Sequence, residues 1–354
     1  MRELGSALPI VAWLAFACGS DSDPGGASTG GTSASGGTSA SGGTGASGGT
    51  SAGGSSGTGA SDGGAGFVPA YAGQPPPGTL VFGAAVGGNT DPVTRHEIPA
   101  GHPLAVHRTF FQWAQRTTAL ASTAKDDLAH QRLPWVSVKT PPWAEMAAGA
   151  HDAEIDEMLD ALASLSGPVW LTVHHEPEGG GGSNVPDDPA GPSGHLAMNA
   201  RVRQRMAQKG LTSVALAPIL MSWTWDPKSG RDPDEWWQPG VYDFLGVDHY
   251  RDAEESLLTA TFASVRTWAA AKGVDVAVGE WGVRGADAAA GARVVEWYEH
   301  AAGSNLDGKG ARVVGLSAFD SGLNSPTGSW ELKGEQLTAF WQLLADPRTA
   351  DVIP

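Results

Sequence analysis

The sequence has a single cysteine, Cys18, among 354 residues, so no disulfide can form within one chain. Positive charge is scarce as well, because 22 Lys and Arg residues face 38 Asp and Glu residues and give a formal net charge of −16. A nucleic-acid-binding protein needs a basic face, so this balance argues against that class of partner. It favours a soluble protein with neutral partners.

Aromatic residues are missing from residues 19–66, which consist almost entirely of Gly, Ser, Thr and Ala. Such a segment cannot bury enough apolar surface to offset the entropy lost on ordering. We therefore expect a disordered linker over residues 19–66 and one folded domain over residues 67–354, which holds 13 of the 14 tryptophans. A segment of this length has the size of a single α/β barrel.

Long apolar runs are also rare. One of them, from Leu8 to Ala17, follows Arg2 and is too short to span a bilayer. Cys18 comes next, and the whole pattern resembles a bacterial lipoprotein signal, in which the cysteine is lipidated. We expect residues 1–18 to be a signal peptide and the protein to be extracytoplasmic. It would be lipid-anchored to the cell envelope through Cys18, or secreted. No other membrane contact and no transmembrane helix are expected in the mature protein.

What the chain does contain is a series of apolar, β-rich runs with helical patterns between them. Their starts are spaced by roughly 25 to 45 residues, which suits a strand, a helix and two loops. The pattern predicts an α/β fold, a closed (β/α)8 TIM barrel. The runs begin at Thr79, Leu104, Pro134, Pro168, Thr212, Tyr242, Val274 and Ala311.

The main alternative is an open, doubly wound sheet, which usually carries a Gly-rich phosphate loop after its first strand. The stretch "VFGAAVGGN" lacks that spacing. Apolar residues at three- and four-residue intervals predict helices between the strands. The predicted helices cover residues 151–167, 259–273, 291–303 and 334–347, and residues 225–240 are predicted to form loops or short turns.

In such a barrel the active site gathers at the carboxyl ends of the strands. Glu176 and Glu280 end the fourth and seventh predicted strands and lie 104 residues apart, about three strand–helix units. Their side chains would face each other across the mouth of the barrel. Glycoside hydrolysis needs such a pair, because one carboxyl protonates the leaving oxygen while the other attacks the anomeric carbon or activates water.

The motifs around these two residues carry a family resemblance. "HHEPE" at 174–178 and "VGEWG" at 278–282 resemble the acid/base and nucleophile motifs of the retaining glycosidases of clan A, which are (β/α)8 barrels. The His175-Glu176 pair is similar to glycoside hydrolase family 26, which includes β-mannanases and related β-glucan and xylan enzymes. The resemblance covers residues 67–354 in order and spacing, and it is sharpest at strands four, six and seven.

The resemblance implies an endo-β-mannanase or related β-glycanase with Glu176 as the general acid/base and Glu280 as the nucleophile. Tyr250 would donate a hydrogen bond to the nucleophile, and Arg108 would lie beside it. We expect the two carboxyl groups to lie about 5 to 5.5 Å apart, as in retaining enzymes.

Further residues are expected to bind or support the substrate. His175 would contact sugar or steady the carboxylates, and the neighbouring His174 is the better candidate for a packed structural histidine, because adjacent strand residues point to opposite faces. The family pattern is not complete, since Phe319 ends strand eight where the clan often has a tryptophan. The remaining supporting residues at the strand ends are Trp143, Trp225, Trp281 and His249.

Two other functions fit parts of the sequence. A non-catalytic carbohydrate-binding barrel lipoprotein would need no opposed carboxylates. A metal-dependent barrel hydrolase would draw its ligands from residues near the strand ends. We favour the glycosidase, and for it we expect a β-linked poly- or oligosaccharide substrate, a monomer, and no metal or cofactor. The possible metal ligands are His107, His174, His175, Asp248 and His249.

Overall fold

The computed structural model describes residues 67–179, 185–251, 254–322 and 329–351. The predicted signal peptide and linker therefore lie outside the described residues. Within the described part, nine strands form one sheet in the order β5-β4-β3-β2-β1-β9-β8-β7-β6, with every pairing parallel. The strands are β1 Val81–Val86, β2 Val106–Phe111, β3 Leu133–Val138, β4 Val169–Val173, β5 Val214–Leu216, β6 Ile219–Met221, β7 Leu245–Tyr250, β8 Val276–Gly282 and β9 Val313–Asp320.

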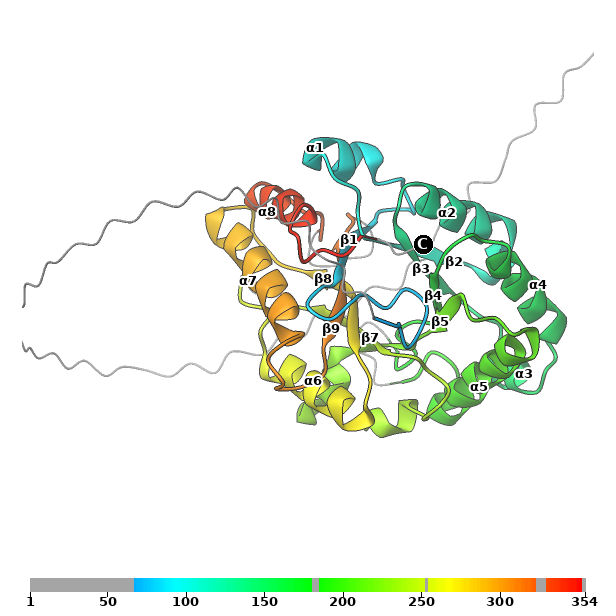
Figure 1. Cartoon of the computed structure of the whole chain (residues 1–354). Helices are drawn as coiled ribbons and strands as arrows, with labels where there is room; N and C mark the ends of the chain where they lie inside the picture. The colour runs from blue at the N-terminus through cyan, green and yellow to red at the C-terminus, as the bar shows by residue number, and fades with distance from the viewer. Residues whose placement is uncertain (1–66, 180–184, 252–253, 323–328, 352–354) are drawn as a thin grey trace, which may run out of the picture. The chain divides into compact units, whose positions relative to one another are not determined.

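Strands β5 and β6 are two halves of one predicted strand, interrupted at Ala217 and Pro218. Ala217 N–H donates to the Leu171 carbonyl of β4 at 3.0 Å, and Gly246 N–H of β7 donates to the Pro218 carbonyl at 2.9 Å. The interrupted strand therefore joins both ends of the sheet, with β5 paired to β4 and β6 paired to β7. The sheet closes with eight strand positions, which confirms the predicted (β/α)8 barrel (Figure 1).

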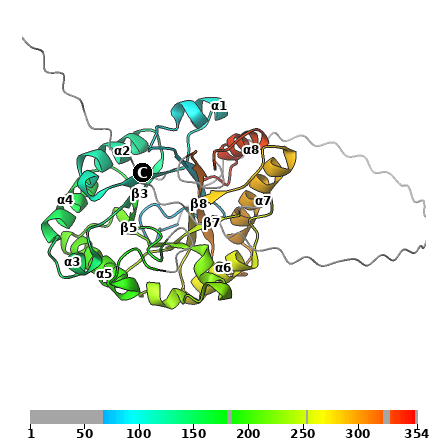
Figure 2. The same cartoon turned by 180° about the vertical axis from the view of Figure 1, so that it is seen from behind.

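The helices cover the outside of the barrel in both views (Figures 1 and 2). Those predicted from periodicity are present. Helix α6 begins where the Thr259 hydroxyl accepts a hydrogen bond from the N–H of Phe262. It ends at Gly273, whose left-handed φ of 73° favours a residue without a side chain. Residues 225–240 form only single turns, as predicted. The helices are α1 Ile98–Ala100, α2 Thr118–Ala129, α3 Trp143–Ala147, α4 Asp152–Ala163, α5 Gly191–Lys209, α6 Ala260–Lys272, α7 Ala288–Ser304 and α8 Glu335–Leu344.

Two apolar cores explain why most strand residues are apolar. One core fills the space between strands and helices, and the other fills the barrel interior. In the interior core Trp135 and Trp170 meet edge to face, with ring centres 5.2 Å apart, and Phe244 lies 4.5 Å from Trp170. Every residue of β1, β3, β4 and β8 is buried, because each lies either against the helices or in the barrel interior.

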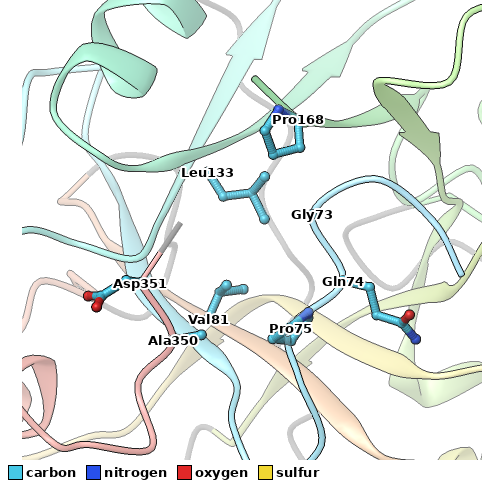
Figure 3. A pocket seen from close by; sticks show the side chains of 8 residues that line it. All are labelled: Gly73, Gln74, Pro75, Val81, Leu133, Pro168, Ala350 and Asp351. Atoms are coloured by element: carbon cyan, nitrogen blue, oxygen red, sulfur yellow. The ribbon is translucent and has the colours of Figure 1, made fainter. Parts of the chain in front are cut away.

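The amino-terminal end of the barrel is closed by the segment around Tyr71. The Tyr71 ring stacks on Phe244 at 5.2 Å and its hydroxyl donates to Asp275, while the indole N–H of Trp170 donates to the Ala72 carbonyl. Figure 3 shows a small cavity at this end, of about 10 Å³, which is room for about one water. The cavity is lined by Gly73, Gln74, Pro75, Val81, Leu133, Pro168, Ala350 and Asp351. This cavity is therefore too small to hold a sugar ring.

No helix in the described ranges is both long enough and apolar enough to cross a membrane.

Candidate active site

A polar layer lies inside the barrel near the carboxyl ends of its strands. Alternate residues of a strand point to opposite faces, so each strand sends only every second side chain inward. Arg108 of β2, Ser137 of β3, Asp248 of β7 and Glu280 of β8 are the inward members here, and all four are buried. The sequence thus places polar and charged side chains near the carboxyl ends of strands whose interior is otherwise apolar.

Glu280 is held by two donors from two other strands. Arg108 Nη2 lies 3.2 Å from its Oε1, and the Tyr250 hydroxyl donates to its Oε2 at 2.8 Å. The guanidinium is itself fixed, because it donates to the Ser137 hydroxyl at 3.1 Å and lies over the ring of Phe110. These contacts bring together Glu280, Tyr250 and Arg108 as predicted from the sequence. They fix the orientation of the Glu280 carboxylate. Glu280 as a whole is only 4% exposed.

Asp248 is a second buried carboxyl beside Glu280, opposite it in the β7–β8 register. Arg108 Nη2 lies 3.9 Å from its Oδ2. Burial raises the pKa of Asp248 well above its ordinary value, the neighbouring charge of Glu280 adds to the rise, Arg108 opposes it, and Glu176 raises it further. Asp248 therefore holds a proton to a higher pH than an exposed aspartate, and both predicted catalytic carboxylates lie within its electrostatic reach.

Glu176 stands on an irregular turn rather than on a regular strand end. Strand β4 ends at Val173, and His174 and Glu176 then adopt left-handed φ angles of 60° and 48°. Such angles are uncommon outside glycine and persist where surrounding contacts enforce them. The Glu176 N–H donates to the Ile219 carbonyl of β6 at 2.8 Å. His175 and Glu176 are partly exposed at the mouth of the barrel, whereas His174 is buried.

His174 is surrounded by polar partners under the mouth. Its Nδ1 lies 3.1 Å from the Trp143 indole N–H and 3.0 Å from the Thr140 hydroxyl. Its Nε2 lies 3.0 Å from Lys139 Nζ and 3.2 Å from Asp187. Burial lowers the pKa of His174, which favours the neutral ring. This placement matches the packed position expected for one of the two adjacent histidines.

Two tryptophans that were expected to bind or support the substrate do not face the mouth. Trp143 and Trp281 are both fully buried, so neither has a face open to a sugar ring. Trp281 follows Glu280 on β8 and therefore points the other way, into the outer core, where its ring centre lies 6.3 Å from that of Phe82. Trp143 donates to His174 from the first turn of α3. Both tryptophans support the site from below or outside.

His249 and Trp225 are also packed rather than open. His249 alternates with Asp248, points outward from β7, and lies between the Ser222 hydroxyl and the Leu257 carbonyl at 2.8 and 2.9 Å. Trp225 is 9% exposed and packs 5.4 Å from Trp268. Arg108, Tyr250, Asp248 and Glu280 form what we call the Glu280 cluster. No described hydrogen bond or ring contact joins His249 or Trp225 to this cluster.

Several rings at the mouth were not predicted as site residues. Phe110 lies 5.4 Å from His175 and 6.4 Å from Phe319, and Phe319 lies 6.3 Å from Tyr250. Trp330 follows β9 and packs 4.7 Å from the Tyr250 ring. Strand alternation could have found Phe110, which is two residues after Arg108 and therefore also points inward. Trp330 lies in a loop, where no periodicity exists to place it.

The possible metal ligands do not gather in one place. His107 points outward from β2 and pairs with Asp127 of α2 at 2.7 Å, while His249 points outward from β7. Among the residues that the structure describes, no group of three or more His, Cys, Asp or Glu side chains is arranged to hold a metal ion.

Solved structures with the same fold are known. An endo-β-1,4-mannanase from Cellulomonas fimi, described as a glycoside hydrolase family 26 enzyme, matches with a TM-score of 0.53 and 16% identity, over 77% of this chain and 72% of that one. A family 26 β-mannanase from Bacteroides ovatus and the catalytic domain of a family 26 endo-β-1,4-mannanase from a Bacillus species each match with a TM-score of 0.52 and 15% identity, over 77% of this chain and 90% of theirs.

No family model and no curated protein matches the sequence. The solved structures nevertheless show that the chain has the (β/α)8 fold of family 26 glycoside hydrolases. The three solved structures named above are β-mannanases, and at 15–16% identity the likeness concerns the fold alone.

Proposed function

We propose that this protein is a retaining glycoside hydrolase that cleaves β-linked polysaccharides, with β-mannan as the preferred class. The observation that supports this most directly is the Glu280 carboxylate. Arg108 at 3.2 Å and Tyr250 at 2.8 Å hold it in the polar layer near the barrel mouth. Glu176 lies close enough to this layer to raise the pKa of Asp248. A carboxylate fixed in orientation beside a cation, below an open carboxyl, is an arrangement that suits double displacement.

In the first step Glu280 attacks the anomeric carbon and the bond to the leaving oxygen breaks. Glu176 gives its proton to that oxygen, so the leaving sugar departs as a neutral alcohol. The Tyr250 hydrogen bond and the Arg108 charge keep the attacking oxygens of Glu280 in place. The product of this step is a glycosyl ester of Glu280.

In the second step Glu176, now ionised, takes a proton from water. The water oxygen attacks the anomeric carbon from the side that the leaving group vacated, and the ester bond to Glu280 breaks. Two inversions at one carbon restore the starting configuration. Glu176 recovers its proton and Glu280 its charge, so the cycle needs no further reactant.

The sugar would meet apolar surface as well as carboxylates. Phe110, Phe319 and Tyr250 are partly exposed rings beside the site, and the C–H face of a pyranose packs well on such rings. The solved structures of the same fold are β-mannanases, which favours β-mannan over other β-glycans.

The test is release of reducing sugar by the full chain from mannan, mixed-linkage glucan, cellulose and xylan. We expect activity on mannan and a product of retained configuration, observed by NMR at early times. An inverted product would contradict the double displacement. Sugar affinity without turnover would favour the carbohydrate-binding alternative instead.

We also propose an extracytoplasmic location, with the protein anchored through a lipid on Cys18. The apolar run ahead of Cys18 and the Gly- and Ser-rich linker after it support this proposal. A polysaccharide outside the cell cannot diffuse across a membrane, so an enzyme that degrades such a substrate would act outside the cell.

A further inference from the structure

Glu178 lies two residues after Glu176 and has a different environment. Glu176 is partly exposed at the mouth, whereas Glu178 is 1% exposed and points into the protein. A group that deep cannot reach a polysaccharide. The segment from His174 to Glu178 holds four ionisable residues. His175 and Glu176 are partly exposed, whereas His174 and Glu178 are buried.

The Glu178 carboxylate joins the turn after β4 to the end of β6 and to the turn that follows it. Its Oε1 accepts a hydrogen bond from the Met221 N–H at 3.0 Å and another from the Thr224 hydroxyl at 2.7 Å. Two residues earlier on each segment, the Glu176 N–H donates to the Ile219 carbonyl at 2.8 Å. The side chain of Glu178 therefore takes over as acceptor where the β4 backbone has left the sheet.

These contacts bear on the geometry of Glu176. Its left-handed φ of 48° costs of order 1–3 kcal/mol in a non-glycine residue, so neighbouring contacts must enforce it. The Ile219 bond fixes the turn on one side of Pro177, and the Glu178 carboxylate fixes it on the other. Arg231 adds weaker bonds to the carbonyls of Glu178 and Gly179, at 3.3 and 3.4 Å.

We propose that Glu178 is a positioning residue for Glu176: its carboxylate ties the acid/base turn to Met221 and Thr224 and thereby sets the place of the Glu176 carboxyl. This inference rests on the proposed function. It differs from a general structural role, because the hydrogen bonds of Glu178 hold the turn that carries Glu176, whereas the bonds that hold Glu280 come from Arg108 and Tyr250.

The test compares two substrates in Glu178→Ala and Glu178→Gln variants of the full chain. One substrate is an unactivated β-1,4-mannan oligosaccharide, and the other is a dinitrophenyl β-mannobioside, whose leaving group needs no proton. Misplacement of about 1 Å costs roughly 100-fold, so Glu178→Ala should lower kcat/KM for the oligosaccharide by about that factor. For the dinitrophenyl substrate, kcat/KM should change by less than about threefold, because its cleavage depends on Glu280 alone. Glutamine keeps an acceptor oxygen for both donors, so Glu178→Gln should restore most of the loss.

A second variant guards against a Glu178→Ala protein that does not fold. Thr224→Val removes one of the two donors and should give a smaller loss with the same preference for the unactivated substrate. The positioning role would be overturned if the folded variants lost kcat/KM equally on both substrates. It would also be overturned if they lost none on either. A Glu176→Ala control separates this result from a failure of the proposed function: if that variant shows no dependence on the leaving group, the acid/base assignment itself is wrong.

Discussion

Glu280 and Glu176 differ in the way the protein surrounds them. Glu280 is buried and has a donor on each oxygen, from Arg108 and Tyr250, as a nucleophile that must approach one carbon in one direction requires. Glu176 is partly exposed on an irregular turn, where it can exchange protons with a leaving group and with water. The two environments match the two roles that the double displacement assigns.

We expect Glu176→Ala to slow substrates with poor leaving groups far more than activated aryl glycosides, because only the former need its proton. Added azide should speed the variant and yield a glycosyl azide of retained configuration. The azide anion needs no base to attack the anomeric carbon and displace the Glu280 carboxylate. Steady-state kinetics with and without azide, followed by NMR of the product, measure both effects. Glu280→Ala is the matched control, and it should lose turnover on every substrate.

Glu178 should also give stability a pH dependence. Burial raises its pKa from 4.5 to about 7, so the folded protein holds a proton that the unfolded chain has already released. The contribution of Glu178 to stability is then fully present below pH 4.5 and falls as pH rises towards 7, by about 3 kcal/mol. Glutamine does not titrate, so urea unfolding from pH 4.5 to 8 should show wild type losing stability relative to Glu178→Gln. Parallel curves for the two proteins would contradict the raised pKa.

At the level of residues, strand alternation explains both the successes and the errors of the sequence analysis. Arg108, Tyr250 and Glu280 were found because polar groups at the ends of apolar strands are conspicuous, and all three point inward. Trp281 was misplaced, although its position next to an inward-pointing glutamate already fixes it outward. Side chains on turns, such as Glu178, follow no such period, so their burial could not be predicted.

Among the secondary-structure elements, the strands were the most predictable, because each is an apolar run that two cores bury from both sides. The break at Ala217 and Pro218 was not predicted, because Pro218 lies within a run that otherwise has a strand pattern. The turn after β4 was not predicted either. Its left-handed residues are His174 and Glu176, which carry no glycine signal for such a conformation.

Strand β1 packs against β2 without room for a side chain at one point. A Cβ on Gly83 would lie 1.8 Å from the carbonyl oxygen of Val106, a backbone atom that cannot move without breaking the sheet. We expect Gly83→Ala to destabilise the protein by about 3 kcal/mol or more, or to prevent folding. Thermal and urea unfolding measure the effect.

Gly303 provides a control for the same substitution. It lies in α7, where a Cβ would meet no heavy atom within 4 Å, and alanine is a better helix former than glycine. Gly303→Ala should therefore stabilise the protein by about 0.5 kcal/mol. A loss of stability at Gly303 equal to that at Gly83 would show that close strand packing is not the cause.

On the scale of the whole molecule, the length and composition of residues 67–354 predicted one barrel, and the closed sheet confirms it. Residues 1–66 remain a matter of prediction. Deleting residues 19–66 should leave the melting temperature and the activity nearly unchanged, because the segment has no aromatic groups with which to pack on a barrel. Calorimetry of the two proteins measures this. A drop of several degrees would mean that the segment docks.

The membrane anchor has its own test. Cys18→Ala should move the protein from the membrane fraction to the soluble fraction of the host envelope, because the lipid on Cys18 is the proposed anchor. Fractionation and mass spectrometry of the mature amino terminus measure the change. A wild-type protein that is already soluble, with its mature terminus elsewhere, would refute lipidation.

The closed end of the barrel determines how the domain can be attached. The chain enters at Tyr71, which packs under the strands, and Ala350 donates to the Leu80 carbonyl just before β1, so both ends of the fold meet at its base. The mouth, where Glu176 and Glu280 lie, is at the opposite end. A support or a fused domain attached directly at Tyr71 or at Ala350 would therefore sit at the base, at the end of the barrel away from Glu280.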